Sequence, residues 1–174
     1  MKPNIIIVLV VLVLVGGLIW WARPAGSPVL PNESDPPGYE EESISSLPTS
    51  VISLDKQSHD FGTISMAKGK VSTAFTLTNV SSSSVQTSKL YTSCMCTTAN
   101  FIQDGKGTEE FGMPGHGFLK PMERTITPGE TVQIIITFDP AAHGPAGVGK
   151  ITRAVRLETD KGILEVSFST NVIP

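Results

Sequence analysis

The chain has 174 residues, with 13 basic and 16 acidic side chains and a formal net charge of −3. That length accommodates one ordinary domain plus an appended segment. The charge offers no basic field for a phosphate backbone, and an aromatic content of 6% offers few stacking surfaces, so we expect no nucleic-acid partner. Two cysteines allow one disulfide bridge or one metal clip, not a disulfide framework.

The N-terminus carries an apolar run without a charged side chain, from Ile5 to Trp21. As a helix it would be about 25 Å long, near the lower limit for crossing a bilayer, and Trp20-Trp21 would suit the membrane boundary. A cleavable signal peptide is the alternative, but the run exceeds the usual apolar region and no small-x-small site follows it. Both interpretations export the remaining chain. We predict a single-pass transmembrane anchor over residues 1–22, at the cell membrane, with the bulk of the chain extracytoplasmic.

Residues 23–48 are rich in Pro, Ser, Gly and Glu, and include Pro36-Pro37-Gly38 and Glu40-Glu41-Glu42. Such a composition cannot bury a core, because it offers little apolar surface. We predict a disordered linker, partly in polyproline II conformation.

From residue 49 onward the pattern is that of short strands separated by turn signals. Turns are predicted at Ser81–Ser84, Pro128-Gly129-Glu130 and Thr159–Gly162. No helical period follows the N-terminal run. We therefore predict an all-β fold for residues 49–174, an immunoglobulin-like β-sandwich of about seven strands. The expected strands cover residues 51–54, 59–64, 71–79, 85–92, 131–138, 150–158 and 163–172.

Two long loops are expected to interrupt these strands. Residues 99–125 are glycine-rich and contain Met113 and His116, and residues 140–149 contain His143. Loops of this length in a compact domain are usually functional or disordered.

Cys94 and Cys96 are the natural place to look for chemistry. In an extended segment, side chains two positions apart point to the same face, so both thiolates could bind one ion. Exported thiols tend to oxidise, but a bridge between such close positions closes a very small ring whose geometry is hard to satisfy. His116, His143 and Met113 would complete a soft ligand set suited to Cu(I) or Zn(II). The alternatives are small core residues or a redox-active bridge.

Two short segments look like catalytic motifs, but the rest of each catalytic signature is missing from the sequence. Asp60-Phe61-Gly62 matches the magnesium-binding triplet of protein kinases, but the other kinase motifs are missing from the sequence. His59 precedes Asp60, yet no serine sits in a strand–turn–helix elbow. We expect the protein not to be an enzyme.

An ordered series of short motifs resembles a known family. The resemblance is to a bacterial family of domains of unknown function with an immunoglobulin-like fold, akin to the abnormal-spindle and Hydin type of domain, and it covers nearly all of residues 50–174. It implies an exported or envelope-associated sandwich without established catalytic activity. The family's cysteines commonly flank glycine, where this chain has Met95. The motifs are His59-Asp60-Phe61-Gly62, Phe75–Asn79, Ser93-Cys94-x-Cys96-Thr97, Pro128-Gly129-Glu130 and Phe138-Asp139-Pro140.

These observations support two functional hypotheses. The first is a membrane-anchored extracytoplasmic domain that binds or scaffolds a protein or another envelope partner. The second is a copper- or zinc-binding protein, for metal handling or redox, that uses Cys94, Cys96, His116 and His143.

Overall fold

The computed structural model describes residues 46–116 and 121–174. The predicted anchor, and the linker up to residue 45, lie outside these residues. The described residues belong to one compact unit. Across the described ranges, no helix has the length and apolar character needed to cross a bilayer.

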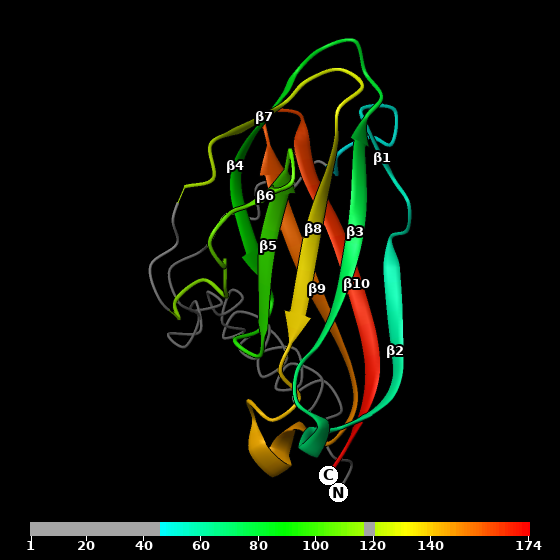
Figure 1. Cartoon of the computed structure of the whole chain (residues 1–174), viewed down its shortest axis with the longest axis vertical. Helices are drawn as coiled ribbons and strands as arrows, with labels where there is room; N and C mark the ends of the chain where they lie inside the picture. The colour runs from blue at the N-terminus through cyan, green and yellow to red at the C-terminus, as the bar shows by residue number, and fades with distance from the viewer. Residues whose placement is uncertain (1–45, 117–120) are drawn as a thin grey trace, which may run out of the picture. The chain divides into compact units, whose positions relative to one another are not determined.

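The described domain is an immunoglobulin-like β-sandwich, which confirms the predicted fold class. Two sheets of five strands each form its layers (Figure 1). The first sheet has the order β1 (Ile52–Leu54), β3 (Val71–Asn79), β8 (Thr131–Phe138), β5 (Thr97–Gln103), β6 (Lys106–Gly107). The second has the order β2 (Ser58–Ser65), β10 (Gly162–Ile173), β9 (Gly149–Thr159), β4 (Val85–Thr92), β7 (Arg124–Ile126). Two short 3-10 helices complete the described elements, η1 (Met66–Lys68) and η2 (Gly144–Gly147).

Most strands were predicted correctly. The expected strands 71–79, 85–92 and 131–138 coincide with β3, β4 and β8. In β3 the buried side chains are Phe75, Leu77 and Asn79, which alternate with half-buried residues. Successive side chains of a strand point to opposite faces, so alternation directly marks the face that is buried.

The predicted loop over residues 99–125 is wrong at both ends. Thr97–Gln103 is strand β5, which pairs with β8 inside the first sheet, and Arg124–Ile126 is strand β7. The inward residues of β5 include Thr97 and Ala99, too small or polar to stand out as a hydrophobic stripe. The turn to β6 is made by Asp104 and Gly105, with φ values of 52° and 72°. An Asp-Gly pair is a typical signal for such a hairpin, and it could have revealed β5.

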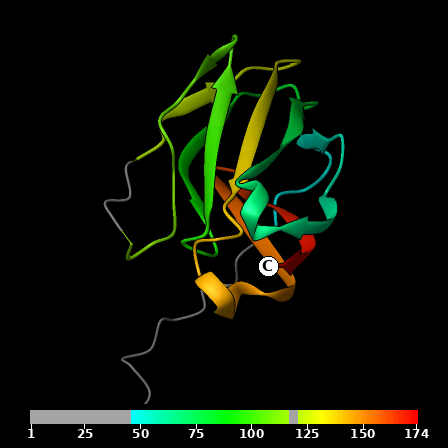
Figure 2. The same ribbon diagram turned by 60° about the horizontal axis from the view of Figure 1, so that its bottom comes forward.

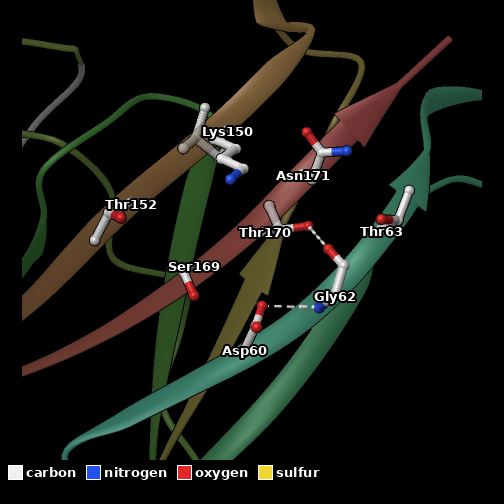
Figure 3. A pocket seen from close by; sticks show the side chains of 9 residues that line it. Asp60, Gly62, Thr63, Lys150, Thr152, Ser169, Thr170 and Asn171 are labelled. Atoms are coloured by element: carbon white, nitrogen blue, oxygen red, sulfur yellow. Dashed lines mark hydrogen bonds between the residues drawn. The ribbon is translucent and has the colours of Figure 1, made fainter.

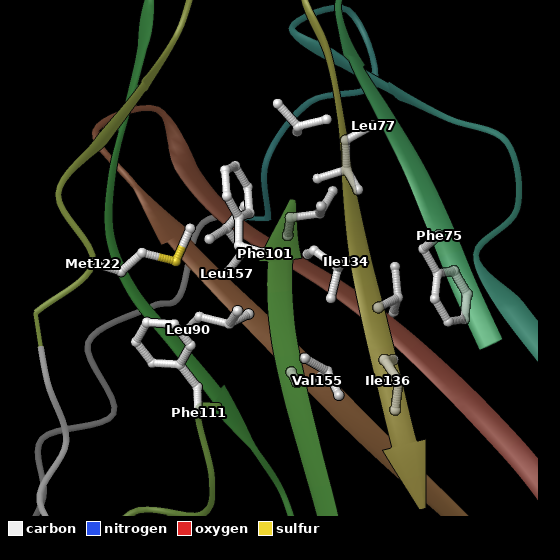
Figure 4. Packing of buried hydrophobic residues seen from close by; sticks show 14 of the residues in the cluster. Phe75, Leu77, Leu90, Phe101, Phe111, Met122, Ile134, Ile136, Val155 and Leu157 are labelled. Atoms are coloured by element: carbon white, nitrogen blue, oxygen red, sulfur yellow. The ribbon is translucent and has the colours of Figure 1, made fainter. Parts of the chain in front are cut away.

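The core lies between the inner faces of the two sheets. Phe75, Phe101 and Phe168 are fully buried, and the rings of Phe138 and Phe168 lie 5.2 Å apart between centroids. Leu47, which the sequence prediction assigned to the linker, belongs to this core, and its backbone N–H donates to Ile163 (2.8 Å). Figure 4 shows the inward side chains, among them Phe75, Leu77, Phe101, Ile134 and Ile136 from the first sheet and Leu90, Val155 and Leu157 from the second.

The sandwich has two chemically different ends. The hairpin end consists of residues 79–85, 127–130 and 159–162, which include short turns between consecutive strands. The disulfide end consists of residues 93–96, between β4 and β5, and residues 139–148, between β8 and β9. Figure 2 turns the end that carries η1 and η2 toward the viewer.

Candidate functional site

Cys94 and Cys96 lie in the short connection between β4 and β5. The backbone N–H of Thr97 donates to the carbonyl of Cys94 (3.1 Å), so the segment is a tight turn and not the extended strand that was expected. The Cα atoms of the two cysteines are 5.3 Å apart. In an extended strand they would be about 6.6 Å apart. The turn therefore brings the two side chains closer together than a strand would.

The two cysteines form a disulfide. The expectation that their spacing makes a bridge too difficult is wrong, because it assumed extended backbone. The observed Cα separation of 5.3 Å lies well within the range usual for disulfides. In this oxidised state neither sulfur is a thiolate, so the pair as it stands does not offer the two anionic ligands that the metal hypothesis requires.

Thr92 holds the turn from inside the domain. Its hydroxyl oxygen lies 3.0 Å from the carbonyl oxygens of both Cys94 and Thr97, and donates its proton to them. Thr92 and Thr97 are each 1% exposed. A buried hydroxyl needs a partner, and here the partners are the backbone groups of the turn itself.

Neighbouring strands fix the two flanks of the turn. The Ser93 N–H donates to Ala154 and the Ser93 hydroxyl accepts from the Ala154 N–H, each at 2.9 Å, which ties the turn to β9. The carbonyl of Cys96 accepts from the Asp139 N–H (2.9 Å), which ties it to the chain that leaves β8. The cysteines are thus anchored to both sheets.

The chain that leaves β8 carries His143 to the disulfide. Asp139 accepts from the Ala141 N–H (2.9 Å) in a local turn, and η2 follows His143. A side-chain carbon on Gly147 would lie 3.2 Å from the His143 Cβ, a tight contact that a small shift of His143 would have to relieve. The Nε2 atom of His143 lies 3.2 Å from Cys94 Sγ, and the residue is exposed.

Three of the five predicted site residues converge. The potential ligand atoms of Cys94, Cys96 and His143 all lie within 4.8 Å of one another. His116 is outside this group. It is exposed, in a turn where its backbone N–H donates to the carbonyl of Met113 (3.2 Å). The long glycine-rich segment therefore does not bring its histidine to the cysteines.

The two sulfurs have different surroundings. Cys94 is 8% exposed, and its Sγ atom also receives the backbone N–H of Cys96 (3.3 Å). Cys96 is 3% exposed, and its Sγ atom lies 3.7 Å from the hydroxyl of Thr97. Met95, between them, is 53% exposed. Both cysteines are buried, Cys96 more than Cys94. The Cys94 sulfur has two potential hydrogen-bond donors, and the Cys96 sulfur has one, the Thr97 hydroxyl.

Ring size limits what this disulfide adds to stability. Chain-entropy arguments give about 1.6 kcal/mol for a ring of three residues, against about 4.7 kcal/mol for one of 100 residues. The turn is also held by the hydrogen bonds of Thr92 and Ser93. Structural stabilisation alone is therefore a weak reason for the pair.

A second feature is a polar groove of about 390 Å³ over strands β2, β9 and β10 (Figure 3). It forms beside a β-bulge. Ser169 pairs with Asp60, and Asn171 pairs with Thr63. Two residues of β2, Phe61 and Gly62, therefore lie opposite a single residue of β10, Thr170. The Thr170 hydroxyl donates to the Gly62 carbonyl (2.9 Å), and Asp60 accepts from the Gly62 N–H (2.9 Å). The lining residues are Asp60, Gly62, Thr63, Lys150, Ile151, Thr152, Ser169, Thr170 and Asn171.

The principal ion pairs of the described domain lie on the second sheet. Lys89 pairs with Glu158 (3.0 Å), and Arg156 pairs with Glu165 (2.6 Å). The hydrogen bond from Arg156 to Glu165 raises the pKa of that guanidinium. These charged side chains lie on β4, β9 and β10, whereas residues 93–96, the turn of the disulfide, include no charged side chain.

A family model described as "Protein of unknown function (DUF1573)" matches residues 52–110, a range that includes the cysteine turn. No curated protein matches the sequence. The predicted resemblance to a family of domains of unknown function with an immunoglobulin-like fold is confirmed at that level. The comparison with abnormal-spindle and Hydin domains stays a prediction.

Two solved structures are similar to this chain at low sequence identity. A protein of unknown function from Porphyromonas gingivalis W83 is 14% identical with a TM-score of 0.50, over 74% of this chain and 48% of that one. The chain thus spans about half the length of that protein. The ASH/PapD-like domain of human CEP192 is 15% identical with a TM-score of 0.42, over 84% of this chain and 94% of that one. The architecture and the family match together define the class: an immunoglobulin-like β-domain of unknown function.

Proposed function

We propose that this chain is an extracytoplasmic immunoglobulin-like domain that binds or scaffolds a partner at the cell envelope. Residues 1–22 would hold it at the cell membrane, and residues 23–48 would form its linker. The disulfide supports export, because such bridges persist mainly in oxidising compartments. The apolar run from Ile5 to Trp21 supports the anchor.

The observation that carries the binding role is the polar groove over β2, β9 and β10. Its lining is dominated by hydroxyl and amide groups, with Asp60 and Lys150 supplying one charge of each sign. Its one carboxylate accepts from the Gly62 N–H, and the lining includes neither histidine nor cysteine. Such a surface suits polar recognition better than acid–base or nucleophilic catalysis. We therefore propose no enzymatic activity.

Site-specific photo-crosslinking in native membranes tests the binding surface. A photoreactive residue at Ser169, on the outer side of β10, should give a discrete adduct with a protein or other envelope component. The matched control places the same residue at Gln133, an exposed position on β8 of the first sheet. Equal adducts from both positions, or adducts from Gln133 alone, would argue against the groove.

Topology is tested separately. Protease added outside spheroplasts should degrade residues 46–174, and the purified protein should retain its N-terminal apolar run. N-terminal sequencing distinguishes the two export routes, since a signal peptide would be missing from the mature chain. Protection of the domain in intact spheroplasts would overturn the extracytoplasmic assignment.

Metal binding by the reduced protein is a second candidate. The observation in its favour is the convergence of Cys94, Cys96 and His143 within 4.8 Å. Two thiolates and an imidazole suit Cu(I) or Zn(II), but the disulfide must first be reduced. Loading the reduced, full-length chain with either ion should give about one ion per chain. Cys94→Ser and His143→Ala should lose it, whereas His116→Ala should retain it. Absence of bound metal in the reduced wild type would reject this candidate.

A further inference from the structure

The disulfide end combines three features that a purely structural bridge does not require. The ring is very small, the sulfur of Cys94 has the imidazole of an exposed histidine beside it, and Cys96 is the more buried of the two cysteines. We propose that Cys94 and Cys96 form a thiol–disulfide exchange site, in which Cys94 reacts with external thiols and disulfides and Cys96 is the resolving cysteine. This activity goes beyond a scaffolding role, and it requires no metal.

Accessibility assigns the two roles. Cys94 is 8% exposed and contacts His143, which belongs to an exposed loop. Cys96 is 3% exposed, and its sulfur lies beside Thr97, which is 1% exposed. Exchange requires an incoming sulfur to approach along the line of the disulfide, so access decides which sulfur is attacked. Cys94 is the less buried of the two cysteines, so we assign to it the reaction with an incoming thiol.

Hydrogen-bond donors favour the same assignment. The backbone N–H of Cys96 lies 3.3 Å from Cys94 Sγ, and His143 Nε2 lies 3.2 Å from the same atom. With its proton on Nε2, the imidazole donates to this sulfur. Both groups would stabilise the negative charge that Cys94 carries as a thiolate. His143 is thus a positioning residue that favours the reduced state.

The exchange is balanced with a thiol as the co-reactant. The thiolate of a first thiol attacks Cys94 Sγ. The Cys94–Cys96 bond breaks, and Cys96 leaves as a thiolate and takes up a proton. A second thiol then attacks the co-reactant sulfur of the mixed disulfide and releases Cys94. Two electrons and two protons pass to the protein, and the two thiols become one disulfide. The reverse sequence oxidises the pair and reduces a partner disulfide.

The chemical class of the partner follows from these steps. It is an exported small thiol or a protein with an accessible dithiol or disulfide. The exposed side chain of Met95, between the two cysteines, offers an apolar contact beside the reacting sulfur for a protein partner.

Single-cysteine variants of the full-length chain test the roles, with glutathione disulfide as the probe. Cys96→Ser leaves Cys94 free, and it should form a mixed disulfide at least tenfold faster than Cys94→Ser, which leaves Cys96. Mass spectrometry of quenched samples gives both rates. Equal rates, or a faster reaction at Cys96, would overturn the assignment.

The wild type provides a test that does not depend on the folding of any variant. In buffers with varied ratios of reduced to oxidised glutathione, the native protein should interconvert reversibly between disulfide and dithiol forms while its circular dichroism stays native. Reduction that occurs only together with unfolding would show a structural bridge and would overturn the proposal. These measurements need neither membrane nor partner, so their failure is distinguishable from failure of the scaffolding role.

His143→Ala should shift the equilibrium toward the disulfide about tenfold, equivalent to about 30 mV for this two-electron couple. His143→Gln, which keeps an N–H donor, should restore part of the shift. His116→Ala is the matched control, an exposed loop histidine outside the group of converging ligands. An identical glutathione equilibrium for His143→Ala and His116→Ala would remove His143 from the proposal.

Discussion

The two ends of the sandwich are built in different ways. At the hairpin end, local turn bonds, such as that from the Thr127 N–H to the Glu130 carboxylate, occur together with bonds between neighbouring turns. The Gly129 N–H donates to the carbonyl of Asn79, and the Asp160 N–H donates to the carbonyl of Gln86. At the disulfide end, residues 92–97 meet residue 154 of β9 and residues 139–143 of the loop after β8. The potentially reactive atoms lie where distant segments converge.

Asn79 connects several segments of the hairpin end, because its contacts are both local and long-range. It is fully buried, and its amide nitrogen donates to the carbonyls of Ser83 (2.9 Å) and Ile126 (2.8 Å). Its side-chain oxygen accepts from the N–H (3.1 Å) and the hydroxyl (2.8 Å) of Ser81. One side chain thus ties the β3–β4 connection to β7.

The largest expected effect is at this position. Asn79→Ala should lower the free energy of unfolding by about 3 kcal/mol, because several hydrogen bonds are lost and the buried Ile126 carbonyl loses a partner. Urea denaturation of the full-length chain measures it. Asn100→Ala is the control, since the half-buried Asn100 donates one side-chain bond, to Thr108 (3.1 Å), and should cost about 1 kcal/mol. Equal losses would mean that the Asn79 network does not hold the hairpin end.

The next effect concerns the disulfide end. Replacement of both cysteines by serine should cost about 1.6 kcal/mol if the bridge acts only through the entropy of its small ring. Urea denaturation of the double variant, and of the wild type with and without reductant, separates the bridge from the side-chain change. A loss larger than that of Asn79→Ala would make the bridge a principal structural element and would reverse the contrast between the ends.

A smaller effect is expected in the turn before β8. Gly129 has a φ of 78°, with open space where a Cβ would lie, so Gly129→Ala should cost about 1 kcal/mol through backbone conformation alone. Gly112→Ala is the matched control, because Gly112 has equal space and its φ lies outside the left-handed region. Thermal denaturation should show a lower midpoint for Gly129→Ala only.

The smallest effect is the response of the β9–β10 turn to acid. A hydrogen bond from the Gln86 N–H, the largest cause, holds the pKa of Asp160 below its ordinary value of 3.8. The folded state therefore favours the carboxylate, so its stabilisation is present above pH 3.8 and is lost as the pH falls through the lower, folded-state pKa. Asp160→Asn should make the free energy of unfolding, measured by urea denaturation at a series of acid pH values, fall less steeply as the pH is lowered. The same pH dependence in the variant and the wild type would exclude this contribution.

The difference between the ends also explains what could be predicted. β3 was predicted correctly because its residues alternate, and alternation records burial directly. β8 was predicted from its β-branched residues, which suit a strand. β5 was missed although it pairs with β8, because neighbouring strands and not its own side chains make Thr97 and Ala99 buried. Turns with Pro-Gly or Asp-Lys-Gly signals were recognised, whereas the Asp104-Gly105 turn was overlooked.

The candidate site was predicted only in part. Cys94, Cys96 and His143 were selected by residue type, but the same criterion selected His116, which lies outside the converging group. Residue type does not distinguish a histidine that lies beside the sulfurs from one that does not, because the length of a loop does not determine where its side chains lie in the fold. The expected extended backbone at the cysteines was wrong, and with it the expected obstacle to a bridge.

The sequence by itself determined the all-β class, most strands and the residue types available for chemistry, because each depends on alternation or local composition. The tertiary structure alone decided that Cys94 and Cys96 share a disulfide and that His143, not His116, lies beside them. The physical reason is that the turn conformation depends on the buried Thr92 hydroxyl and on backbone bonds from β9 and residue 139. Those partners are brought together by packing of the two sheets.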